Sequence, residues 1–550
     1  MNAALLAAGV LAVFAAAYAL YSRWLDRRVF LLDPHRDTPA HSRKDHIDYC
    51  PTRPSVLFGH HFASICGLGP IIGPAIAALW GWLPALLWIV CGAVVIGAVH
   101  DFGALVLSVR YDGRSIGDIT NDLIGPRARL LFLVLIFFLI ALAMGVFASV
   151  IATLFDPDHY PQAVLPSAIL IVLAVAIGML VYRRRVPLGP ATAVCLVLMT
   201  GSLWLGQAFP ITGLSRTQWI VVLLAYAYVA SSLPVWVLLQ PRDYLNAFQL
   251  YAGIGLMYAG LFILRPEFAA PPVNRMAADL PPVFPFLFVT VACGAISGFH
   301  SLVCSGTTSK QLDREPHARP IGYGAMLAEA SMAVIVLLAC TAGVATPLLW
   351  HERYSGWQSM QGLGASLGTF IDGGALFVSQ VGIPRALASV LISVVVVGFA
   401  LTTLDSATRL LRYNIEELGR TLGVRFATNR YAASALAVAA IGYFALMKSG
   451  KSLWQLFGTT NQLLAALALL AVAAYLAQRR RPAAAYALPM LFMLVTTTTA
   501  MTIKLGEFRA AGQTSLWVVS AIVLVLALWL VLEALVSFMN ARRSRHASRG

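Results

Sequence analysis

The sequence predicts an all-α polytopic membrane protein with about 15 transmembrane helices, arranged around a five-plus-five inverted repeat that contains two broken helices. The first observation behind this prediction is composition. The chain is 59% hydrophobic and 11% charged, whereas soluble domains carry about 25% charged residues. The second observation is that two apolar stretches contain helix-breaking residues, which in transporters mark the binding site.

The first interruption lies between Gly67 and Pro74, inside an apolar run from about 56 to 82. These eight residues read GLGPIIGP, so three are glycine and two are proline. In hydrocarbon, a broken backbone survives only where protein or a water-filled cavity satisfies its freed polar groups. We therefore expect this helix to break in the middle of the membrane.

A similar pattern recurs near residue 300. Both copies read G-x-H followed by five residues and a glycine, with one constant offset of 239 residues. The matched residues are Gly59, His61 and Gly67 in the first copy and Gly298, His300 and Gly306 in the second. Discontinuous helices in corresponding positions of two repeats indicate a transporter's binding site.

Apolar runs near the length of about 20 residues that spans a bilayer place fifteen helices along the chain. They are expected at roughly 3–22, 55–80, 84–110, 127–154, 164–182, 188–208, 217–239, 244–265, 283–306, 321–346, 383–411, 430–447, 452–477, 484–503 and 514–538. The first is interpreted as a helix rather than a signal peptide, because it lacks a basic start and a clear processing site. The glycine-rich run 362–381 is either a re-entrant or interfacial segment or a further crossing.

The basic residues indicate the orientation of these helices. Short cytoplasmic loops of membrane proteins carry an excess of Lys and Arg, and 30 of the 39 basic residues fall in loops on one side of the expected helices. This predicts an N-terminus outside and a C-terminus in the cytoplasm. The net charge of +15 is then explained by cytoplasmic loops, and no nucleic-acid partner is expected.

The expected helix directions also define a domain organisation. The interrupted helices would be the second and the ninth, which run in opposite directions as an inverted repeat requires. The expected parts are 1–54, an N-terminal helix and basic cytoplasmic loop; 55–208, the first five-helix repeat; 209–282, two inserted helices; 283–477, the second five-helix repeat; and 478–550, two C-terminal helices and a basic tail.

Several short motifs carry a family resemblance. They are YCPT at 49–52, LFGHHFA at 57–63, DGRS at 112–115, LQPRDYL at 239–245, SGFHS at 297–301, SGTT at 305–308 and FGTTNQ at 457–462. On these motifs the chain resembles the carbon starvation protein A family, which groups with the amino acid-polyamine-organocation superfamily. The resemblance implies a bacterial inner-membrane transporter of peptides or pyruvate, linked to carbon starvation, with a leucine-transporter-like fold.

The expected substrate site lies at the two breaks. A break exposes N–H groups at the start of one half-helix and C=O groups at the end of the other, so anion and cation sites lie close together. The candidate substrate-binding residues are His61, Gly67, Gly69, Gly73, His300, Ser305, Gly306 and Thr307. The alternatives are a kinked helix packed tightly through its glycines and, for the histidines, capping of nearby polar groups.

The expected coupling residues are acidic or hydroxylic. Charge inside a membrane is costly enough to suggest function, which selects Asp101, Glu329 and Asp405, with Asp372 in the glycine-rich run. A structural ion pair with Arg409, one turn further along the helix, is an equal explanation for Asp405. The family resemblance implies a Na⁺ site at Thr402, Thr403 and Ser406, whereas ordinary interhelical hydrogen bonding is the alternative.

These observations favour a secondary active importer of small carboxylate-bearing nutrients, short peptides or pyruvate, coupled to H⁺ or Na⁺. The alternative is a transporter-like nutrient sensor that signals to a cytoplasmic partner, and a channel is a weaker third reading. Neither enzymatic activity nor a cofactor is expected, and no P-loop for ATP occurs. The seven cysteines are scattered without a CxxC pair, and the sequence makes no prediction of oligomeric state.

Overall fold

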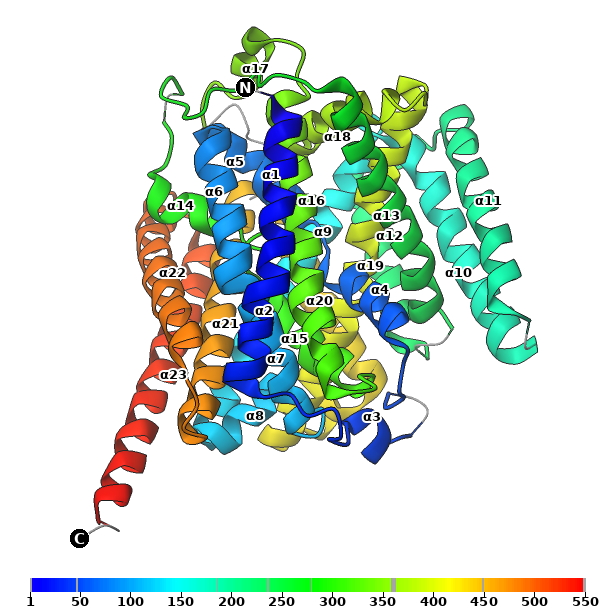
Figure 1. Cartoon of the computed structure of the whole chain (residues 1–550). Helices are drawn as coiled ribbons and strands as arrows, with labels where there is room; N and C mark the ends of the chain where they lie inside the picture. Colours follow the sequence, from blue (N-terminus) through cyan, green and yellow to red (C-terminus); the bar gives the residue numbers. More distant parts are fainter. Residues whose placement is uncertain are drawn as a thin grey trace.

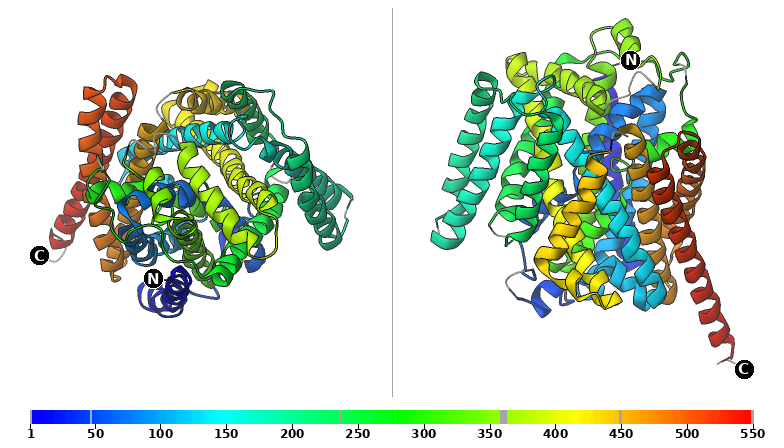
Figure 2. Two further views of the ribbon diagram at one scale, coloured as in Figure 1. Left: turned by 90° about the horizontal axis from the view of Figure 1, so that it is seen from above. Right: turned by 180° about the vertical axis from the view of Figure 1, so that it is seen from behind.

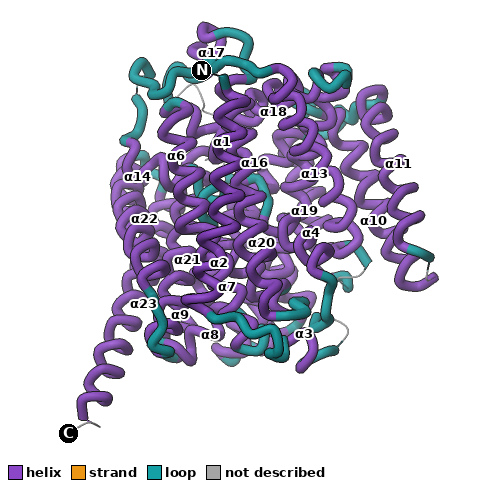
Figure 3. The backbone as a smooth tube through the Cα atoms, in the orientation of Figure 1, coloured by secondary structure: helices purple, strands orange, loops and turns teal. Residues whose placement is uncertain are grey.

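A computed structural model describes residues 2–547 apart from 46–47, 185, 235–236, 278, 358–362 and 448–449. The described residues form one tall bundle of helices (Figure 1) joined by loops, and no β-strand occurs among them (Figure 3). The two termini lie at opposite ends of this bundle. The expected all-α class is therefore confirmed.

The helices follow one another with short connections along most of the chain. Their bounds are α1 Ala3–Ala16, α2 Ser22–Trp24, α3 Pro39–Ser42, α4 Pro54–Ile65, α5 Gly69–Ala77, α6 Trp82–Gly92, α7 Ala98–Arg110, α8 Ile116–Leu123, α9 Pro126–Leu154, α10 Val164–Arg184, α11 Leu188–Ala208, α12 Arg216–Ser232, α13 Leu239–Leu264, α14 Val283–Thr290, α15 Gly298–Gly306, α16 Ala325–Ala342, α17 Pro347–Arg353, α18 Leu363–Ser379, α19 Arg385–Leu422, α20 Arg430–Ala445, α21 Gly450–Gln478, α22 Ala484–Ala510 and α23 Thr514–Ala547. Short π-helical or 3-10 turns extend several of them.

The number of membrane spans differs from the expectation. Among the described residues, 11 helices are long and apolar enough to cross a membrane, or up to 12 if the bent pair α4 and α5 forms one span. The count of fifteen is therefore not confirmed. The remaining expected spans coincide with α12, with α14 plus α15, and with α20, whose helices are shorter than the usual spanning length of about 20 residues.

The glycine-rich run forms a helix of its own. Gly362 lies outside the described residues, whereas 363–379 form α18. Figure 1 shows α18 close to α17 and to the end of the bundle where the N-terminus lies. With 17 residues, α18 is shorter than a typical span.

The first interruption is where the sequence predicts it. The chain leaves helical geometry at Cys66, and α5 begins at Gly69 with Pro70 in its first turn. Proline is well accommodated there because the first helical N–H groups have no partner within the helix. The two half-helices are bent by 51°, which confirms a broken helix.

The second interruption lies upstream of the predicted position. α14 ends at Thr290 and α15 begins at Gly298, so the break spans 291–297. Gly306 is the last residue of α15 instead of a break residue. The glycine at 298 serves close packing, because a Cβ there would lie 2.3 Å from the carbonyl oxygen of Asn461.

The two interruptions lie against each other inside the bundle. A Cβ on Gly69 would lie 2.2 Å from both Cβ and Sγ of Cys293, and a Cβ on Gly73 would lie 2.8 Å from the carbonyl oxygen of Thr290. Only glycine allows the backbones to approach this closely. The expected meeting of the broken helices is therefore present.

The helices between the two interruptions pack in two different ways. α10 and α11 pack on each other and stand at the edge of the bundle in both views of Figure 2. α12 instead packs against α9, α19 and α20, and α13 packs against α4, α18 and α19. The helices expected as an insertion are thus in contact with the core.

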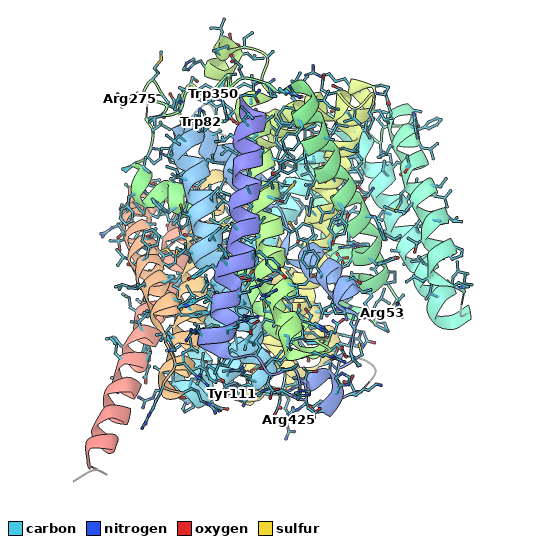
Figure 4. All side chains as sticks on the ribbon, in the orientation of Figure 1. Arg53, Trp82, Tyr111, Arg275, Trp350 and Arg425 are labelled. Carbon is cyan, nitrogen blue, oxygen red and sulfur yellow. The ribbon has the colours of Figure 1, made fainter. Side chains whose placement is uncertain are left out.

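The ends of the bundle differ in side-chain content. Arg53, Tyr111 and Arg425 mark one end in Figure 4, and Trp82 and Trp350 mark the other. We call the first the basic end, because Arg53, which precedes α4, and Arg425, which follows α19, both lie there and belong to arginine-rich stretches of the sequence. The C-terminus lies beyond the basic end (Figure 1).

Candidate functional site

The second break is held open by a side chain of α21. Asn461 accepts a hydrogen bond through Oδ1 from the backbone N–H of Phe299 at 2.9 Å, and its Nδ2 donates to Oγ of Ser297 at 3.0 Å. Asn461 is fully buried. The amide thus supplies a partner to the start of α15, where helix N–H groups have none within the helix.

Two other side chains donate to carbonyl groups at this break. Nε2 of Gln462 donates to the carbonyl oxygen of Phe288 at 2.6 Å, and Nε1 of Trp88 donates to that of Val291 at 3.0 Å. A buried carbonyl without a partner would be costly. Trp88, Asn461 and Gln462 are not among the site residues predicted from the sequence, although an Asn-Gln pair inside an apolar run is a visible signal.

His300 lies in the first turn of α15, directly after the second break. Its Nδ1 is 2.8 Å from Oδ2 of Asp101 on α7, and its Nε2 is 3.1 Å from Oε2 of Glu329 on α16. His100 completes the group, with Nδ1 at 2.7 Å from Oδ1 of Asp101. We call these four residues the His300 cluster, and each is at most 1% exposed.

The His300 cluster contains two carboxyl groups and two imidazoles, all of them buried. Buried charges are stable only when paired, and the geometry pairs each carboxyl with an imidazole. Both carboxylate oxygens of Glu329, Nε2 of His300 and Nε2 of His100 have no hydrogen-bond partner among the described residues, so His300 and Glu329 form an ion pair without a hydrogen bond. The cluster is therefore able to hold a variable number of protons, and it connects a broken helix to two of its neighbours.

His61 does not join the His300 cluster. It lies in α4, before the first break, and its Nδ1 is 2.8 Å from Oγ1 of Thr308. The sequence match between His61 and His300 therefore does not correspond to equivalent positions, because His300 follows its break. Gly67 lies in the first break, where a Cβ would meet Phe147 and Oγ1 of Thr403, each at 2.9 Å.

Two hydrogen bonds connect α4 and the segment before it to the segment that follows α15, at the basic end. The first is the hydrogen bond between His61 and Thr308. The second is a backbone bond in which the N–H of Thr52 donates to the carbonyl oxygen of Gln311 at 3.0 Å. Thr52 lies two residues before the start of α4, and Gln311 lies five residues after the end of α15.

Asp405 has a different partner from the one proposed. Its Oδ2 forms an ion pair with Nη1 of Arg242 and accepts a hydrogen bond from the Tyr226 hydroxyl at 2.6 Å. Arg409 turns away and donates to the carbonyl oxygens of Ala230 and Leu233 at 2.8 and 2.6 Å. The suggested Asp405–Arg409 ion pair is therefore wrong, because α12 and α13 supply closer partners.

The hydroxyl groups proposed for sodium point to different surroundings. Oγ1 of Thr402 accepts a hydrogen bond from Asn246 at 2.9 Å, whereas Thr403 lies at the first break and donates to the carbonyl oxygen of Phe399 at 3.0 Å. Ser406 lines a cavity at the basic end. Asp372 pairs with Arg353 at 2.9 Å and is 47% exposed, so it is not a deeply buried carboxylate.

The cavity at the basic end measures about 60 Å³, and we call it the vestibule. It lies between α4, α15 and α19, and it brings Gly306, Thr307 and Ser406 together. Ser305 faces elsewhere, since its Oγ accepts from the backbone N–H of Ile116 at 3.1 Å. The vestibule is lined by Asp48, His60, Ser64, Leu239, Gln240, Val303, Gly306, Thr307, Lys310, Gln311, Ser406, Arg409, Leu410 and Tyr413.

A helical bundle of membrane-spanning length, with two interrupted helices facing each other beside buried ionisable groups, defines a membrane transport protein and not an enzyme. The chain belongs to the carbon starvation protein CstA family, whose model matches residues 2–350 and 351–500. The resemblance seen in the sequence is therefore confirmed.

Relatives of known name match along most of the chain. The peptide transporter CstA of Escherichia coli K12 is 34% identical, and the match covers 91% of this chain and 81% of that transporter. The peptide transporter CstA of Bacillus subtilis 168 is 32% identical, covering 97% and 96%. The pyruvate/proton symporter BtsT of Escherichia coli K12 is 32% identical, covering 91% and 82%.

The fold is also similar to a solved transporter structure. MhsT, in complex with L-phenylalanine, superposes with a TM-score of 0.50 and covers 88% of this chain and 99% of its own. The sequence identity is 12%, so the similarity concerns the fold alone. MhsT has the leucine-transporter fold that the family resemblance implies.

Proposed function

We propose that this protein is a proton-coupled importer of small carboxylate-bearing nutrients, pyruvate or short peptides, in the bacterial inner membrane. The single observation that carries the proposal is the position of the His300 cluster. It begins in the first turn after the second break, where that break faces the first one. Substrate and proton would thus act on the same half-helix.

The substrate carboxylate would bind at the exposed backbone of the breaks. α5 and α15 each begin at a break, and helix N-termini attract anions through their free N–H groups and the helix dipole. Gly67, Gly69 and Gly73 let the chains approach closely there. Pyruvate and peptides, the cargoes in the relatives' names, both carry a carboxylate.

Two observations support a proton instead of sodium as the coupling ion. Asp405, the carboxylate nearest in sequence to Thr402 and Ser406, is already paired with Arg242, and Thr402 is bonded to Asn246. By contrast, the His300 cluster consists entirely of groups that bind protons. One relative is also named a proton symporter.

The packing supports a revised repeat. In the second repeat, the last helix, α21, packs against the broken helix through α14 and α15. In the first half the helix that packs against α4 is α13, and α12 packs against α9. The first repeat would therefore contain α4–α5, α6–α7, α9, α12 and α13, with α10 and α11 as the insertion.

The remaining parts of the proposal concern placement and regulation. The basic end would face the cytoplasm, with the N-terminus outside, because basic loops stay inside. The family name supports a link to carbon starvation, which would appear as higher transport when other carbon sources are exhausted.

The proposal is tested with purified protein in liposomes and labelled pyruvate or dipeptide. An inward proton gradient should drive accumulation, a protonophore should abolish it, and replacing Na⁺ by choline should leave it unchanged. Gly67→Leu should lose uptake while remaining folded, because its side chain would collide with Phe147 and Thr403. Substrate binding without accumulation in the wild type would instead support a sensor.

A further inference from the structure

We infer that the vestibule is a second binding site for a small carboxylate anion, on the route between the breaks and the basic end, with Arg409 holding the carboxylate. This inference rests on the proposed function, because it concerns the same substrate after it leaves the breaks. Nothing in the family match or in the relatives' names assigns this cavity or Arg409.

Arg409 is a buried cation with spare binding capacity. It is 6% exposed and lines the vestibule. Its Nη2 donates to the carbonyl oxygens of Ala230 and Leu233, which fixes the guanidinium. Its Nε–H is enclosed and has no hydrogen-bond partner, and no ion pair with a carboxylate is found for Arg409 among the described residues. Both carbonyl bonds use Nη2, so Nη1 is the donor that remains for an anion.

An unpaired buried cation is costly, whereas a carboxylate that accepts from its N–H forms a charge-assisted hydrogen bond. Carbonyl groups orient the guanidinium but do not neutralise its charge. An anion that enters the vestibule would therefore be held more tightly than a neutral solute of the same size.

The charged side chains of the vestibule, Arg409 included, sum to one net positive charge. Lys310 adds a cation and Asp48 adds a carboxylate, and Nδ1 of His60 lies 3.5 Å from Oδ2 of Asp243. The Lys310 ammonium lies 5.4 Å from the centroid of the Tyr49 ring, and burial lowers the pKa of Lys310. This balance matches a monoanion.

The size of the vestibule selects among carboxylates. Its volume of about 60 Å³ has room for roughly two to six water molecules. A monocarboxylate with few heavy atoms, such as pyruvate, fits that space without large rearrangement, whereas a peptide would require the surrounding helices to separate. Hydroxyl groups of Thr307 and Ser406 are available for the remaining oxygens.

The test compares the two faces of the protein. Counterflow of labelled pyruvate is measured in right-side-out and inside-out membrane vesicles, which present opposite ends of the transporter. Arg409→Gln should raise the KM measured from the basic end about tenfold, because a charge-assisted hydrogen bond is lost. The KM measured from the opposite end should change by less than about twofold, which is a small difference in binding free energy.

Two matched variants test whether a changed KM is caused by misfolding. Asp48→Asn removes the opposing charge and should lower the KM from the basic end, which is a change that misfolding would not produce. Arg425→Gln changes an exposed arginine at the same end and should leave both values unchanged. Size-exclusion chromatography of each variant reports folding.

The outcomes separate this inference from the proposed function. Wild-type transport with an unchanged KM at both faces in Arg409→Gln, or with equal increases at both faces, overturns the vestibule site alone. An unchanged KM in Asp48→Asn also counts against it. Vesicles in which the wild type moves no pyruvate overturn the proposed function and this inference together.

Discussion

Nδ1 of His300 lies 2.8 Å from Oδ2 of Asp101, and both side chains are completely buried. The contact joins α15, which follows the second break, to α7 of the first half of the chain. Any movement of α15 during transport therefore either carries Asp101 along or separates a buried ion pair. The protonation state decides which of these two movements requires less free energy, because neutral groups separate at lower cost than charged ones.

Glu329→Gln tests the role of the His300 cluster in coupling. The substitution keeps the size of the side chain and removes its proton site, so proton-driven accumulation should fall by at least about tenfold, in line with the loss of a buried ionic contact. Exchange of labelled for unlabelled substrate should continue, since exchange needs no net proton movement. Both rates are measured in the same liposomes.

The control for Glu329→Gln is Glu533→Gln on α23, whose carboxylate lies 3.7 Å from Arg127 outside the cluster. It should leave both accumulation and exchange unchanged. Full proton-driven accumulation in Glu329→Gln would show that this carboxyl does not carry the coupling proton.

His300→Ala should destabilise the protein as well as stop transport. It leaves Asp101 and Glu329 buried without their shared partner, and removing one member of a buried ion pair costs about 3–5 kcal/mol. We expect a clear decrease in the thermal unfolding temperature in detergent. Adding Glu329→Gln to the same chain should recover part of the loss, because Asp101 keeps His100 as a partner whereas the charge of Glu329 is left unpaired and is then removed.

The matched histidine control is His35→Ala, an exposed residue of the loop before α4. Its unfolding temperature should equal that of the wild type. If His300→Ala were equally stable, the four groups would not form the charged network that their distances indicate.

Gly69→Ala tests the contact between the two breaks. Its new Cβ would lie 2.2 Å from Cβ and Sγ of Cys293, which no small adjustment relieves, so uptake should be lost. Combining it with Cys293→Gly should restore part of the uptake by freeing that space. Uptake of labelled substrate is the measurement.

Gly255→Ala is the matched glycine control, because nothing lies within 4 Å of a Cβ at that position in α13. It should transport normally. Unimpaired uptake in Gly69→Ala would mean that the breaks are further apart in the working protein.

Arg242 and Asp405 should behave as a pair in stability measurements. Arg242→Gln leaves the buried Asp405 carboxylate without its ionic partner, at a cost of about 3–5 kcal/mol. Asp405→Asn should cost less, because Arg242 still has Asp243 at 4.0 Å. The double variant should be less destabilised than the sum of the two single changes. A double-mutant cycle of unfolding temperatures, with Arg420→Gln as an exposed comparison, measures the coupling, and strict additivity would exclude it.

The sequence predicted those features that depend on local composition. The apolar helices follow from long hydrophobic runs, and the first break follows from the glycines and prolines at 67–74. Asp101 and Glu329 stood out because charge is rare in such runs. Their burial is observed, whereas their role in coupling remains a prediction.

The second break could not be located from local composition. Its residues, VACGAIS at 291–297, contain one glycine and no proline, so their intrinsic preference for a break is weak. The contacts from Asn461, Gln462 and Trp88 hold this segment out of helical geometry. Those residues lie far away in the sequence, and only the folded arrangement brings them together.

The ion pairs were hidden for the same reason. Asp101 and His300 are 199 residues apart, and Arg242 and Asp405 are 163 apart. An i,i+4 spacing made Arg409 the obvious partner for Asp405, but the carbonyl groups at the end of α12 bind it instead. Sequence spacing identifies neighbours on one helix and does not rank them against other helices.

The link between Thr52 and Gln311, together with that between His61 and Thr308, limits how the route can open toward the basic end. Because these two hydrogen bonds connect α4 and the segment before it to the segment that follows α15, a passage between the two helices would require both hydrogen bonds to break. If α4 and α15 tilt together away from α13 and α19, both hydrogen bonds are preserved. Cargo would then leave at the basic end beside Arg409, along the outside of α4 and α15 and not between these two helices.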